Sequence, residues 1–195
     1  MIEKIILASK SNVRKKILEE NLIKCVVKPA NIDENLIKKS LLAKGASPEL
    51  VSKNLAELKS NKISQQINEE IVLGADSVID LNGKIVSKPK SREEALKILK
   101  KLNGMSHYLI SSVCISKNGA TIWSCTDKAL LTMKKMPDKE LKLYLEKIKD
   151  DDLYAYNVYQ IEGEGKFLFS KIEGDPNTIM GLPIKQIKEY LGLFL

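Results

Sequence analysis

Two patterns of apolar positions alternate along this chain. Short apolar runs predict β-strands over residues 4–8, 24–27, 71–81, 84–86, 108–116, 121–133 and 166–172. Segments in which apolar residues recur every three or four positions predict helices over residues 13–21, 138–149 and 183–191, a helix capped by Ser91 that runs to Leu102, and a long helix that opens at Ser47-Pro48. The stretch PANIDEN, residues 29–35, is predicted to be a loop.

Small polar residues mark where these elements begin and turn. Ser11 or Asn12 is suited to cap the first helix, because a short oxygen-bearing side chain accepts a hydrogen bond from a free backbone N–H. Asn82-Gly83 and Asn118-Gly119 are typical of two-residue hairpin turns. Hairpins require antiparallel pairing, whereas alternating strands and helices favour parallel pairing. The chain is therefore predicted to be an α/β protein with a mixed sheet and helices on its faces.

The long helix is predicted to bury one apolar side. Its apolar residues near one face are Leu50, Val51, Leu55, Leu58 and Ile63. With 195 residues, of which 44% are hydrophobic, the chain can bury a sizeable core. A single domain over residues 1–195 is predicted.

The cysteines and the single histidine restrict the chemistry. Cys25, Cys114 and Cys125 are an odd set without C-x-x-C spacing, which argues against a disulfide framework and a zinc site and suits a reducing cytosol. Apolar runs are too short for a membrane span or a signal peptide, so a cytoplasmic protein with no membrane partner is predicted. Because His107 is the only histidine, any metal is expected to be a hard cation held by carboxylates and phosphates.

The net charge of +7 favours anionic partners. The lysines, however, are spread over helix-like segments and mixed with acidic residues, which favours a solvated surface over a nucleic-acid footprint. Aromatic residues make up only 5% of the chain, so stacking platforms for single strands are scarce. No nucleic-acid partner is predicted.

The stretch ILASKSNVRKK, residues 6–16, combines a strand end, small hydroxyl residues and a helix start. Free backbone N–H groups at a helix N-terminus bind anions. Ser9 and Ser11 add hydroxyl donors, and Arg14, one of only two arginines among 32 basic residues, can fork onto a phosphate. The alternative is an ordinary helix cap followed by a surface arginine.

A second candidate site lies in GADSVIDLNGKIVSKP, residues 74–89. Asp76 interrupts an apolar strand, where a lone carboxylate is unfavourable unless it is paired or near an edge. Lys88, held by the stiff Lys88-Pro89 step, follows after one hairpin and is expected to return beside Asp76. The alternative is that Asp76 only ends a strand by hydrogen bonding to the next turn.

Three other charged residues are candidates for the same chemistry. Glu34 lies in the predicted loop beside Asp33, Lys59 lies on the long helix, and Glu162 lies in IEGEG. For each of them a structural or solvated role is the alternative. No phosphate-binding Walker-A loop or dinucleotide fingerprint is present in the sequence.

Taken together, these motifs resemble the Maf family of nucleoside triphosphate pyrophosphatases. The resemblance rests on LASKSNVR, IDE, LAELK, GADS, SKP, GMSH, IEGEG, IEGDPNT and GLP, which occur in the family's order along nearly the whole chain. It implies an elongated mixed sheet like that of inosine-triphosphate pyrophosphatases, with a cleft between two lobes. It also implies hydrolysis of a nucleoside triphosphate to a nucleoside monophosphate and pyrophosphate.

The resemblance also implies roles for the candidate residues. Asp76 takes the role of catalytic base or water-orienting carboxylate, and Glu34 joins it in binding Mg²⁺ or Mn²⁺. Lys59 and Lys88 become phosphate contacts. The remaining triphosphate contacts are Ser9, Ser11 and Arg14. A set of lysines, an arginine and a divalent cation around a carboxylate suits this reaction, because a triphosphate chiefly needs its charge neutralised.

Three positions bear on the choice of base, and they point in different directions. Val13 fits neither the pyrimidine branch of the family nor the 7-methyl-GTP branch, Ser77 favours the first, and Glu162 favours the second. A carboxylate only accepts hydrogen bonds and so matches the adjacent N–H donors of a guanine edge. The expectation is a guanine-type base such as that of 7-methyl-GTP, with dTTP or UTP as the alternative.

Two alternative functions would place the protein in a class other than that of enzymes. Because the family is also linked with septum formation, a nucleotide-binding regulator of cell division with low turnover is one of them. Binding of nucleic acid, supported by net charge alone, is the other. The oligomeric state is left open between a monomer and a homodimer.

Overall fold

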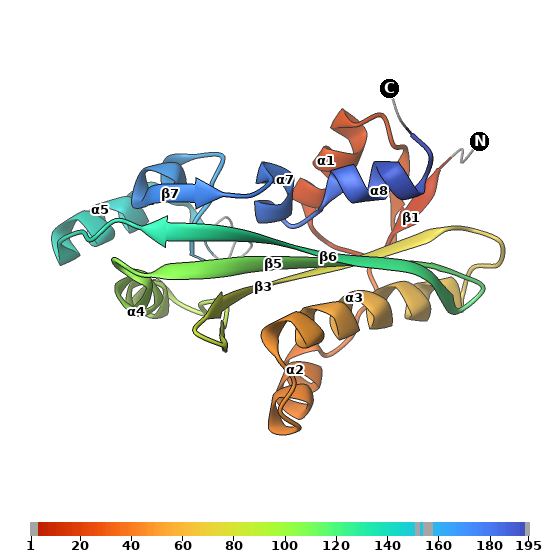
Figure 1. Cartoon of the computed structure of the whole chain (residues 1–195), viewed down its shortest axis with the longest axis horizontal. Coiled ribbons are helices and arrows are strands. Elements are labelled where there is room, and N and C mark those ends of the chain that lie inside the picture. Colours follow the sequence, from red (N-terminus) through yellow and green to blue (C-terminus); the bar gives the residue numbers. More distant parts are fainter. Residues whose placement is uncertain (1–3, 151–152, 154–157, 194–195) are drawn as a thin grey trace. The chain divides into compact units, whose positions relative to one another are not determined.

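A computed structural model describes residues 4–150, 153 and 158–193 (Figure 1). Its strands are β1 (Ile5–Leu7), β2 (Cys25–Val27), β3 (Val72–Leu81), β4 (Lys84–Val86), β5 (Ser106–Lys117), β6 (Ala120–Met133) and β7 (Phe169–Glu173). Its helices are α1 (Asn12–Glu20), α2 (Glu34–Ala43), α3 (Pro48–Ser64), α4 (Arg92–Leu102), α5 (Asp138–Lys147), the 3₁₀ helix η1 (Glu164–Leu168), α7 (Pro176–Ile179) and α8 (Ile184–Tyr190).

The strands form one mixed sheet in the order β2-β1-β3-β5-β6-β7, with β4 paired to β3. Strand β1 is parallel to both β2 and β3. The pairs β3–β4 and β6–β7 are antiparallel. The predicted α/β fold with a mixed sheet is confirmed. Both predicted hairpin turns are present as well, and Asn82, Gly83, Asn118 and Gly119 all have positive φ.

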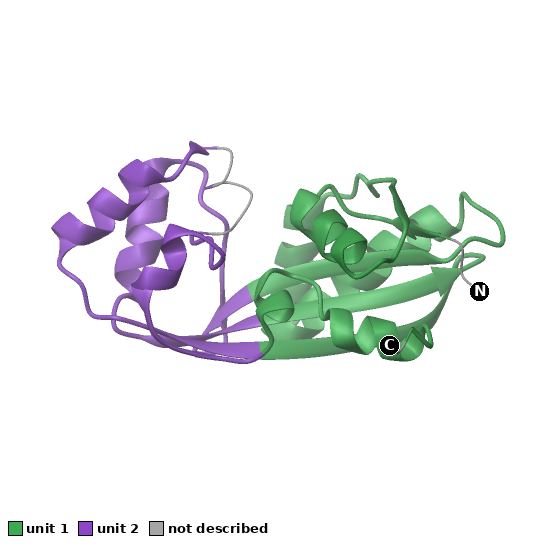
Figure 2. Ribbon diagram, turned by 90° about the horizontal axis from the view of Figure 1, so that it is seen from above, with its two compact units in different colours: residues 1–78, 110–128, 175–195 green, residues 79–109, 129–174 purple. Residues whose placement is uncertain are grey.

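The chain divides into two compact units (Figure 2). Unit 1 comprises Met1–Val78, Ile110–Lys128 and Asp175–Leu195, and unit 2 comprises Ile79–Leu109 and Ala129–Gly174. Strands β3, β5 and β6 contribute residues to both units. The single domain over residues 1–195 and the cleft between two lobes remain predictions.

Alternating residues of the central strands build the two sides of unit 1. Ile5 and Leu7 of β1 join a cluster with residues of α1, α8, β3 and β5. Ile6 and Ala8 join a second cluster that includes Ile63 of α3. Figure 1 accordingly shows α1 and α8 on one face of the sheet and α3 on the other. A shift of one residue along β1 or β3 therefore exchanges the two faces.

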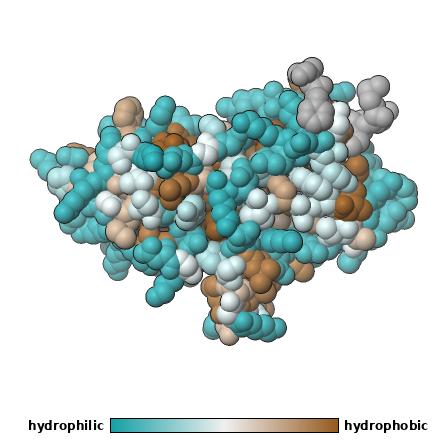
Figure 3. Space-filling model, in the orientation of Figure 1, coloured by the Kyte–Doolittle hydropathy of each residue, from teal (hydrophilic) through white to brown (hydrophobic). Residues whose placement is uncertain are grey.

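Helix α2 was not predicted and replaces the end of the predicted loop. Asp33 caps it by accepting a hydrogen bond from the backbone N–H of Leu36 at 3.0 Å. The helix buries none of its residues, and Leu36 and Leu42 are exposed. Figure 3 shows an apolar patch in the region of α2. Without a buried apolar face, the segment lacks the core-facing pattern that identifies a helix in sequence.

The predicted face of α3 is partly wrong. Val51, Leu55 and Ile63 are buried, but Leu50 and Leu58 are 47% and 43% exposed. The buried side of the helix is completed instead by small and polar residues, namely Ser52, Ala56, Lys59, Ser60 and Ser64. Apolar spacing alone misassigned this face because the helix packs against a strand that carries Gly74 and Asp76.

The C-terminal third differs in detail from the prediction. The expected strand over residues 166–172 is shared between η1 and the shorter β7, and the short helix α7 was not predicted. In unit 2, Tyr159 packs its ring edge-on against Phe169 and receives or donates a hydrogen bond at Nε2 of His107, 2.9 Å away. The three cysteines are free, as predicted. Among the described residues no helix is long and apolar enough to cross a membrane.

Candidate active site

The loop between β1 and α1 is organised by two serine hydroxyls. Ser9 Oγ accepts a hydrogen bond from the backbone N–H of Ser11 at 3.2 Å. Ser11 is the N-cap of α1, and its Oγ accepts from the backbone N–H of Arg14 at 3.3 Å. The alternative cap, Asn12, is instead the first residue of the helix. Both hydroxyl hydrogens lack an acceptor among the described residues, so both remain available to an anion.

Arg14 is held by four acceptors of the protein itself. Its Nε donates to the carbonyl of Gly181 at 2.9 Å. Its Nη1 donates to the carbonyl of Ala75 at 2.9 Å and to Ser9 Oγ at 3.1 Å. Its Nη2 donates to Ser77 Oγ at 3.0 Å. Of the five N–H donors of a guanidinium, only one, on Nη2, has no acceptor in the described part of the chain.

Burial and nearby carboxylates act in opposite directions on Arg14. Burial lowers the pKa of the guanidinium below its usual value, and the negative charges of Asp76 and Glu34 oppose that shift. The predicted bidentate fork onto a phosphate is not available without breaking a contact described above. A single hydrogen bond from Nη2 is available.

Strand β3 directs consecutive side chains to opposite faces of the sheet. Gly74 faces α3 so closely that a Cβ atom there would lie 2.2 Å from the carbonyl oxygen of Ala56. Asp76 lies on the same face, whereas Ser77 lies on the face of α1. The glycine allows α3 to approach β3, and this approach brings Lys59 to Asp76.

Lys59 lies between the two predicted acidic residues. Its Nζ is 2.8 Å from Oδ1 of Asp76 and 2.8 Å from Oε1 of Glu34, and it also donates to the carbonyl of Ala75 at 3.4 Å. The side chains of Lys59 and Asp76 are 9% and 5% exposed, whereas that of Glu34 is 41% exposed. All three donors of the ammonium group therefore have acceptors in the protein.

Asp76 keeps one oxygen without a protein partner. Oδ1 binds Lys59, and the backbone carbonyl accepts from Ser52 Oγ at 3.0 Å. Oδ2 is buried and has no hydrogen-bond partner among the described residues. A buried carboxylate oxygen normally has a partner, so Oδ2 marks a place where a ligand atom is expected.

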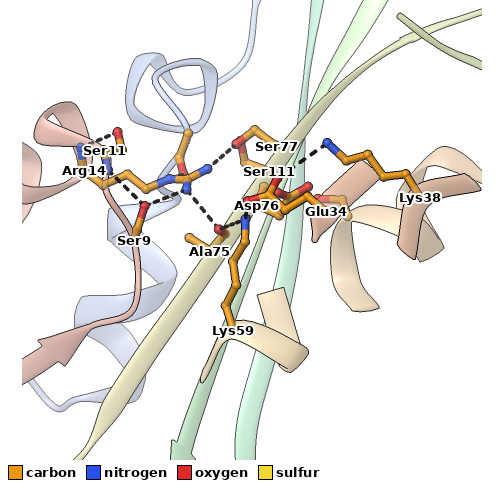
Figure 4. Close-up of polar contacts among 12 residues, drawn as sticks. Ser9, Ser11, Arg14, Glu34, Lys38, Lys59, Ala75, Asp76, Ser77 and Ser111 are labelled. Carbon is orange, nitrogen blue, oxygen red and sulfur yellow. Dashed lines mark hydrogen bonds and ion pairs between the residues drawn. The ribbon is translucent and has the colours of Figure 1, made fainter. Parts of the chain in front are cut away.

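The carbonyl oxygen of Ala75 joins the two groups of side chains (Figure 4). It accepts hydrogen bonds from Arg14 on one side and from Lys59 on the other. The loop of Ser9, Ser11 and Arg14 and the strand that carries Asp76, which belong to two separate candidate sites in the sequence, therefore lie in one continuous cluster within unit 1. This juxtaposition makes the cluster the candidate active site.

The other predicted residues are distributed differently. Ser77 lies in the cluster, and its Oγ is 2.8 Å from Ser111 Oγ. Val13 is partly buried and packs against the core of unit 1. Lys88 and Glu162 are exposed residues of unit 2, so the predicted return of Lys88 to Asp76 and the role of Glu162 remain predictions.

Some residues of the cluster were missed in the sequence. Ser111 is fully buried, and it donates to the backbone carbonyl of Thr178 at 2.7 Å. Thr178 in turn donates from its Oγ1 to Asp127 Oδ2 at 2.6 Å. Ser111 interrupts the apolar run LISSVCI, which is the same kind of sequence signal as Asp76 in its apolar strand. Nothing local in the sequence indicates the contribution of Gly181, which is made by its backbone.

The site offers few ligands to a metal ion. Within the described residues no group of three or more histidine, cysteine or acidic side chains could hold one. Glu34 and Asp76 are the two carboxylates that contact Lys59, whose Nζ lies between them. Two carboxylates suit Mg²⁺, which keeps several waters and binds substrate phosphates, better than Ca²⁺, which takes six to eight oxygen ligands.

Comparison with known proteins decides the family. The family model described as Maf-like protein matches residues 4–194. The chain belongs to the Maf-like family. It is 69% identical over 191 residues to a nucleoside triphosphate pyrophosphatase of Pelagibacter ubique (strain HTCC1062), a match that covers 98% of each chain. The Maf-like resemblance seen in the sequence is confirmed.

Other Maf-like relatives carry more specific names. The chain is 38% identical over 184 residues to a 7-methyl-GTP pyrophosphatase of Bartonella henselae, and the match covers 94% of this chain and 92% of the relative. Among solved structures, a HAM1 protein from Coxiella burnetii matches with a TM-score of 0.57 and 15% identity over 97% of this chain and 98% of that one. At this identity the likeness concerns the fold alone.

Proposed function

We propose that this protein hydrolyses a nucleoside triphosphate between its α and β phosphates, releasing a nucleoside monophosphate and pyrophosphate. The observation that carries the proposal is the unpartnered Oδ2 of Asp76, buried beside Lys59 and joined through Ala75 to the Arg14 loop. A carboxylate oxygen that is free to bind water, next to a group of anion-binding donors, is the arrangement this hydrolysis needs. The name of the relative at 69% identity agrees with the proposal.

In this proposal Asp76 binds the water that attacks the triphosphate. Its Oδ2 orients the water and accepts a proton from it, while the water oxygen bonds to the α-phosphorus. The bond from that phosphorus to the oxygen bridging the α and β phosphates breaks, and pyrophosphate leaves with the bonding electrons. The reaction needs no covalent enzyme intermediate, so positioning and charge neutralisation supply most of the catalysis.

In this proposal the hydrogen-bond donors around Asp76 bind the triphosphate. The free hydroxyl hydrogens of Ser9 and Ser11, together with the remaining Nη2 hydrogen of Arg14, face no protein acceptor among the described residues. Lys59 can bind a phosphate oxygen once it releases one of its three present acceptors. Lys88 is assigned a further phosphate contact on the basis of the family motif alone.

A divalent cation, Mg²⁺ or Mn²⁺, is assigned to Glu34 and Asp76. Oε1 of Glu34 and Oδ1 of Asp76 both bind Lys59 Nζ and would hold such an ion where Lys59 turns to a phosphate, which leaves Oδ2 of Asp76 to the water. Two carboxylates leave most of its coordination to water and phosphate oxygens, which is usual for Mg²⁺ in triphosphate sites. When bound, the cation neutralises phosphate charge.

The base is assigned to the guanine type, with 7-methyl-GTP as the favoured substrate. Glu162 is the residue that supports this choice, because a carboxylate matches the adjacent N–H donors of a guanine edge. Relatives named 7-methyl-GTP pyrophosphatase agree with it. Val13 and Ser77 complete the specificity positions. The reaction is assigned to the cytoplasm, where the three free cysteines stay reduced.

The test of the reaction is an Asp76→Asn variant. It keeps the size of the side chain and its contact with Lys59 but weakens its ability to accept a proton, so pyrophosphate release is expected to collapse while nucleotide binding persists. Asp138→Asn, which removes an exposed carboxylate from α5, is the matched control and is expected to behave like the wild-type protein. Activity of Asp76→Asn within threefold of wild type would contradict the role of Asp76.

The test of the base is a hydrolysis panel of dTTP, UTP, GTP and 7-methyl-GTP with Mg²⁺. A preference for the guanine nucleotides is expected, and a clear pyrimidine preference would overturn the Glu162 argument while leaving the reaction intact. Wild-type protein that bound nucleotide without releasing pyrophosphate would indicate the low-turnover regulator instead.

A further inference from the structure

We propose that Ser111 is a positioning residue that aims the phosphate-binding N–H of Arg14 by acting through Ser77. The proposal rests on the proposed function, because it deepens the role of Arg14 in binding the triphosphate. Ser111 lies on β5, is fully buried, and has its Oγ 2.8 Å from Ser77 Oγ. It touches neither Arg14 nor Asp76 in any described contact.

The acceptors fix the direction of each hydrogen bond in the series that runs from Arg14 through Ser77 and Ser111 to the carbonyl of Thr178. A carbonyl oxygen cannot donate, so Ser111 must give its one hydroxyl hydrogen to the carbonyl of Thr178, 2.7 Å away. Ser77 must therefore donate to Ser111 across their 2.8 Å contact. With its hydrogen used in this way, Ser77 Oγ turns a lone pair to Nη2 of Arg14 at 3.0 Å.

Both ends of this series of hydrogen bonds attach to one turn at the C-terminal end of α7. Ser111 binds the carbonyl of Thr178, and Arg14 Nε binds the carbonyl of Gly181. The turn is closed by a 3.1 Å hydrogen bond from the N–H of Gly181 to the carbonyl of Thr178. Gly181 has a φ of +99°, and a Cβ there would lie 3.1 Å from Ser77 Oγ. The guanidinium, the two serines and the turn thus form a closed hydrogen-bonded ring.

This ring fixes the direction of the last free donor of Arg14. A guanidinium is planar and rigid, so acceptors on Nε, on Nη1 and on one hydrogen of Nη2 also set the direction of the other Nη2 hydrogen. Ser77 is the acceptor on Nη2, and Ser111 decides where the lone pair of Ser77 points. Without Ser111, the hydroxyl of Ser77 is free to rotate, and the direction of Nη2 then rests on the contacts at Nε and Nη1 alone.

The neighbouring residue supplies a matched control. Ser112 is as deeply buried as Ser111 and makes one side-chain hydrogen bond, 2.9 Å to Thr126 Oγ1. Adjacent strand residues point to opposite faces, so Ser112 lies on the face away from Arg14. Ser111→Ala and Ser112→Ala therefore remove the same group from the same strand at the same burial.

The experiment compares these variants with a Ser77→Ala/Ser111→Ala double mutant. Ser111→Ala is expected to lower kcat/KM about tenfold for GTP and for UTP alike, since the phosphate end is affected, and Ser77→Ala is expected to lower it about tenfold for GTP. The double mutant is expected to lose about tenfold as well, and not the hundredfold of independent sites. Ser112→Ala is expected to keep the wild-type value. Thermal unfolding of each variant shows whether a lower kcat/KM comes from loss of the folded structure or from a misplaced Arg14 side chain.

Inorganic tripolyphosphate gives a readout without base or hydrolysis. Its Kd, measured by calorimetry with Mg²⁺, is expected to weaken about tenfold in Ser111→Ala and to stay unchanged in Ser112→Ala. Equal behaviour of the two variants, or independent effects of Ser77 and Ser111 in an active enzyme, would overturn this inference alone. Wild-type protein that neither hydrolyses nucleotides nor binds tripolyphosphate would overturn the proposed function, and the inference with it.

Discussion

The Nζ atom of Lys59 lies 2.8 Å from Oδ1 of Asp76, and both side chains are almost entirely removed from water. Removing two charges from water is unfavourable, and their mutual attraction repays it only while both partners are present. Glu34 completes the group on its solvent side. The pair is thus a stability element as well as a candidate catalytic one, and the two roles separate on mutation.

Lys59→Met is expected to lower the free energy of unfolding by about 3–5 kcal/mol, because it leaves the carboxylate of Asp76 buried without its cation. Adding Asp76→Asn removes that charge, so the double variant is expected to be more stable than Lys59→Met alone. Urea denaturation of the single and double variants measures this coupling. Additive losses would mean that the pair is not coupled.

Gly74→Ala tests the close approach of α3 to β3. The added Cβ would meet the carbonyl oxygen of Ala56 at 2.2 Å and the backbone nitrogen of Ser60 at 2.7 Å. Overpacking against backbone is expected to destabilise the protein by about 3 kcal/mol. Gly45→Ala is the control, since Gly45 has a φ of +79° but open space around its Cβ position. Gly45→Ala is expected to be destabilised only by backbone strain, by about 1–2 kcal/mol. Thermal unfolding measures both variants.

His107 makes stability depend on acidity. Burial lowers the pKa of its imidazole from 6.5 to about 4 in the folded protein. The unfolded chain therefore binds a proton at a higher pH than the folded one, so this contribution to stability is complete above pH 6.5 and is lost as the pH falls towards 4. The loss amounts to about 3 kcal/mol.

His107→Gln carries no such proton and is expected to flatten the fall in the free energy of unfolding over that range. Urea denaturation at a series of pH values compares it with wild type. An unchanged slope in the variant would assign the acid sensitivity to other groups.

The two arginines are expected to respond differently to lysine. Arg92 bonds the backbone carbonyls of Leu145 and Ile148 at the end of α5 and pairs with Asp150. Arg92→Lys is therefore expected to lower the unfolding free energy by about 1–2 kcal/mol and to leave kcat/KM unchanged.

A lysine has three N–H donors, whereas Arg14 has five: four bind acceptors within the protein, and the fifth is proposed to bind substrate. Arg14→Lys therefore cannot replace all of these contacts. Its kcat/KM for nucleotide hydrolysis is expected to fall at least about tenfold. Steady-state kinetics and thermal melts on both variants provide the comparison. Equal kinetic losses in the two would remove Arg14 from the substrate site.

Sequence was most informative where a polar residue stood in an unfavourable place. Asp76 was found because a carboxylate inside an apolar strand needs a partner, and the partner proved to be Lys59. Helix α2 was missed because it buries no residue, so its apolar positions carry no core-facing pattern.

Sequence motifs could not predict the contacts of Arg14. Its acceptors at Ala75 and Gly181 are backbone carbonyls 61 and 167 positions away along the chain. Backbone atoms have no residue-type signature, so only the folded chain brings them into view. The motif pointed to the arginine but could not say how many of its donors the protein already uses.

The junction between the two halves of the cluster is the main-chain oxygen of residue 75. No codon specifies this atom, because every amino acid supplies the same carbonyl. Point mutations can therefore alter the side chains on either face of β3, including that of Ser77, for which a role in substrate choice is proposed, without deleting the link between Arg14 and Lys59. A change of side chain at position 77 would leave this main-chain connection in place.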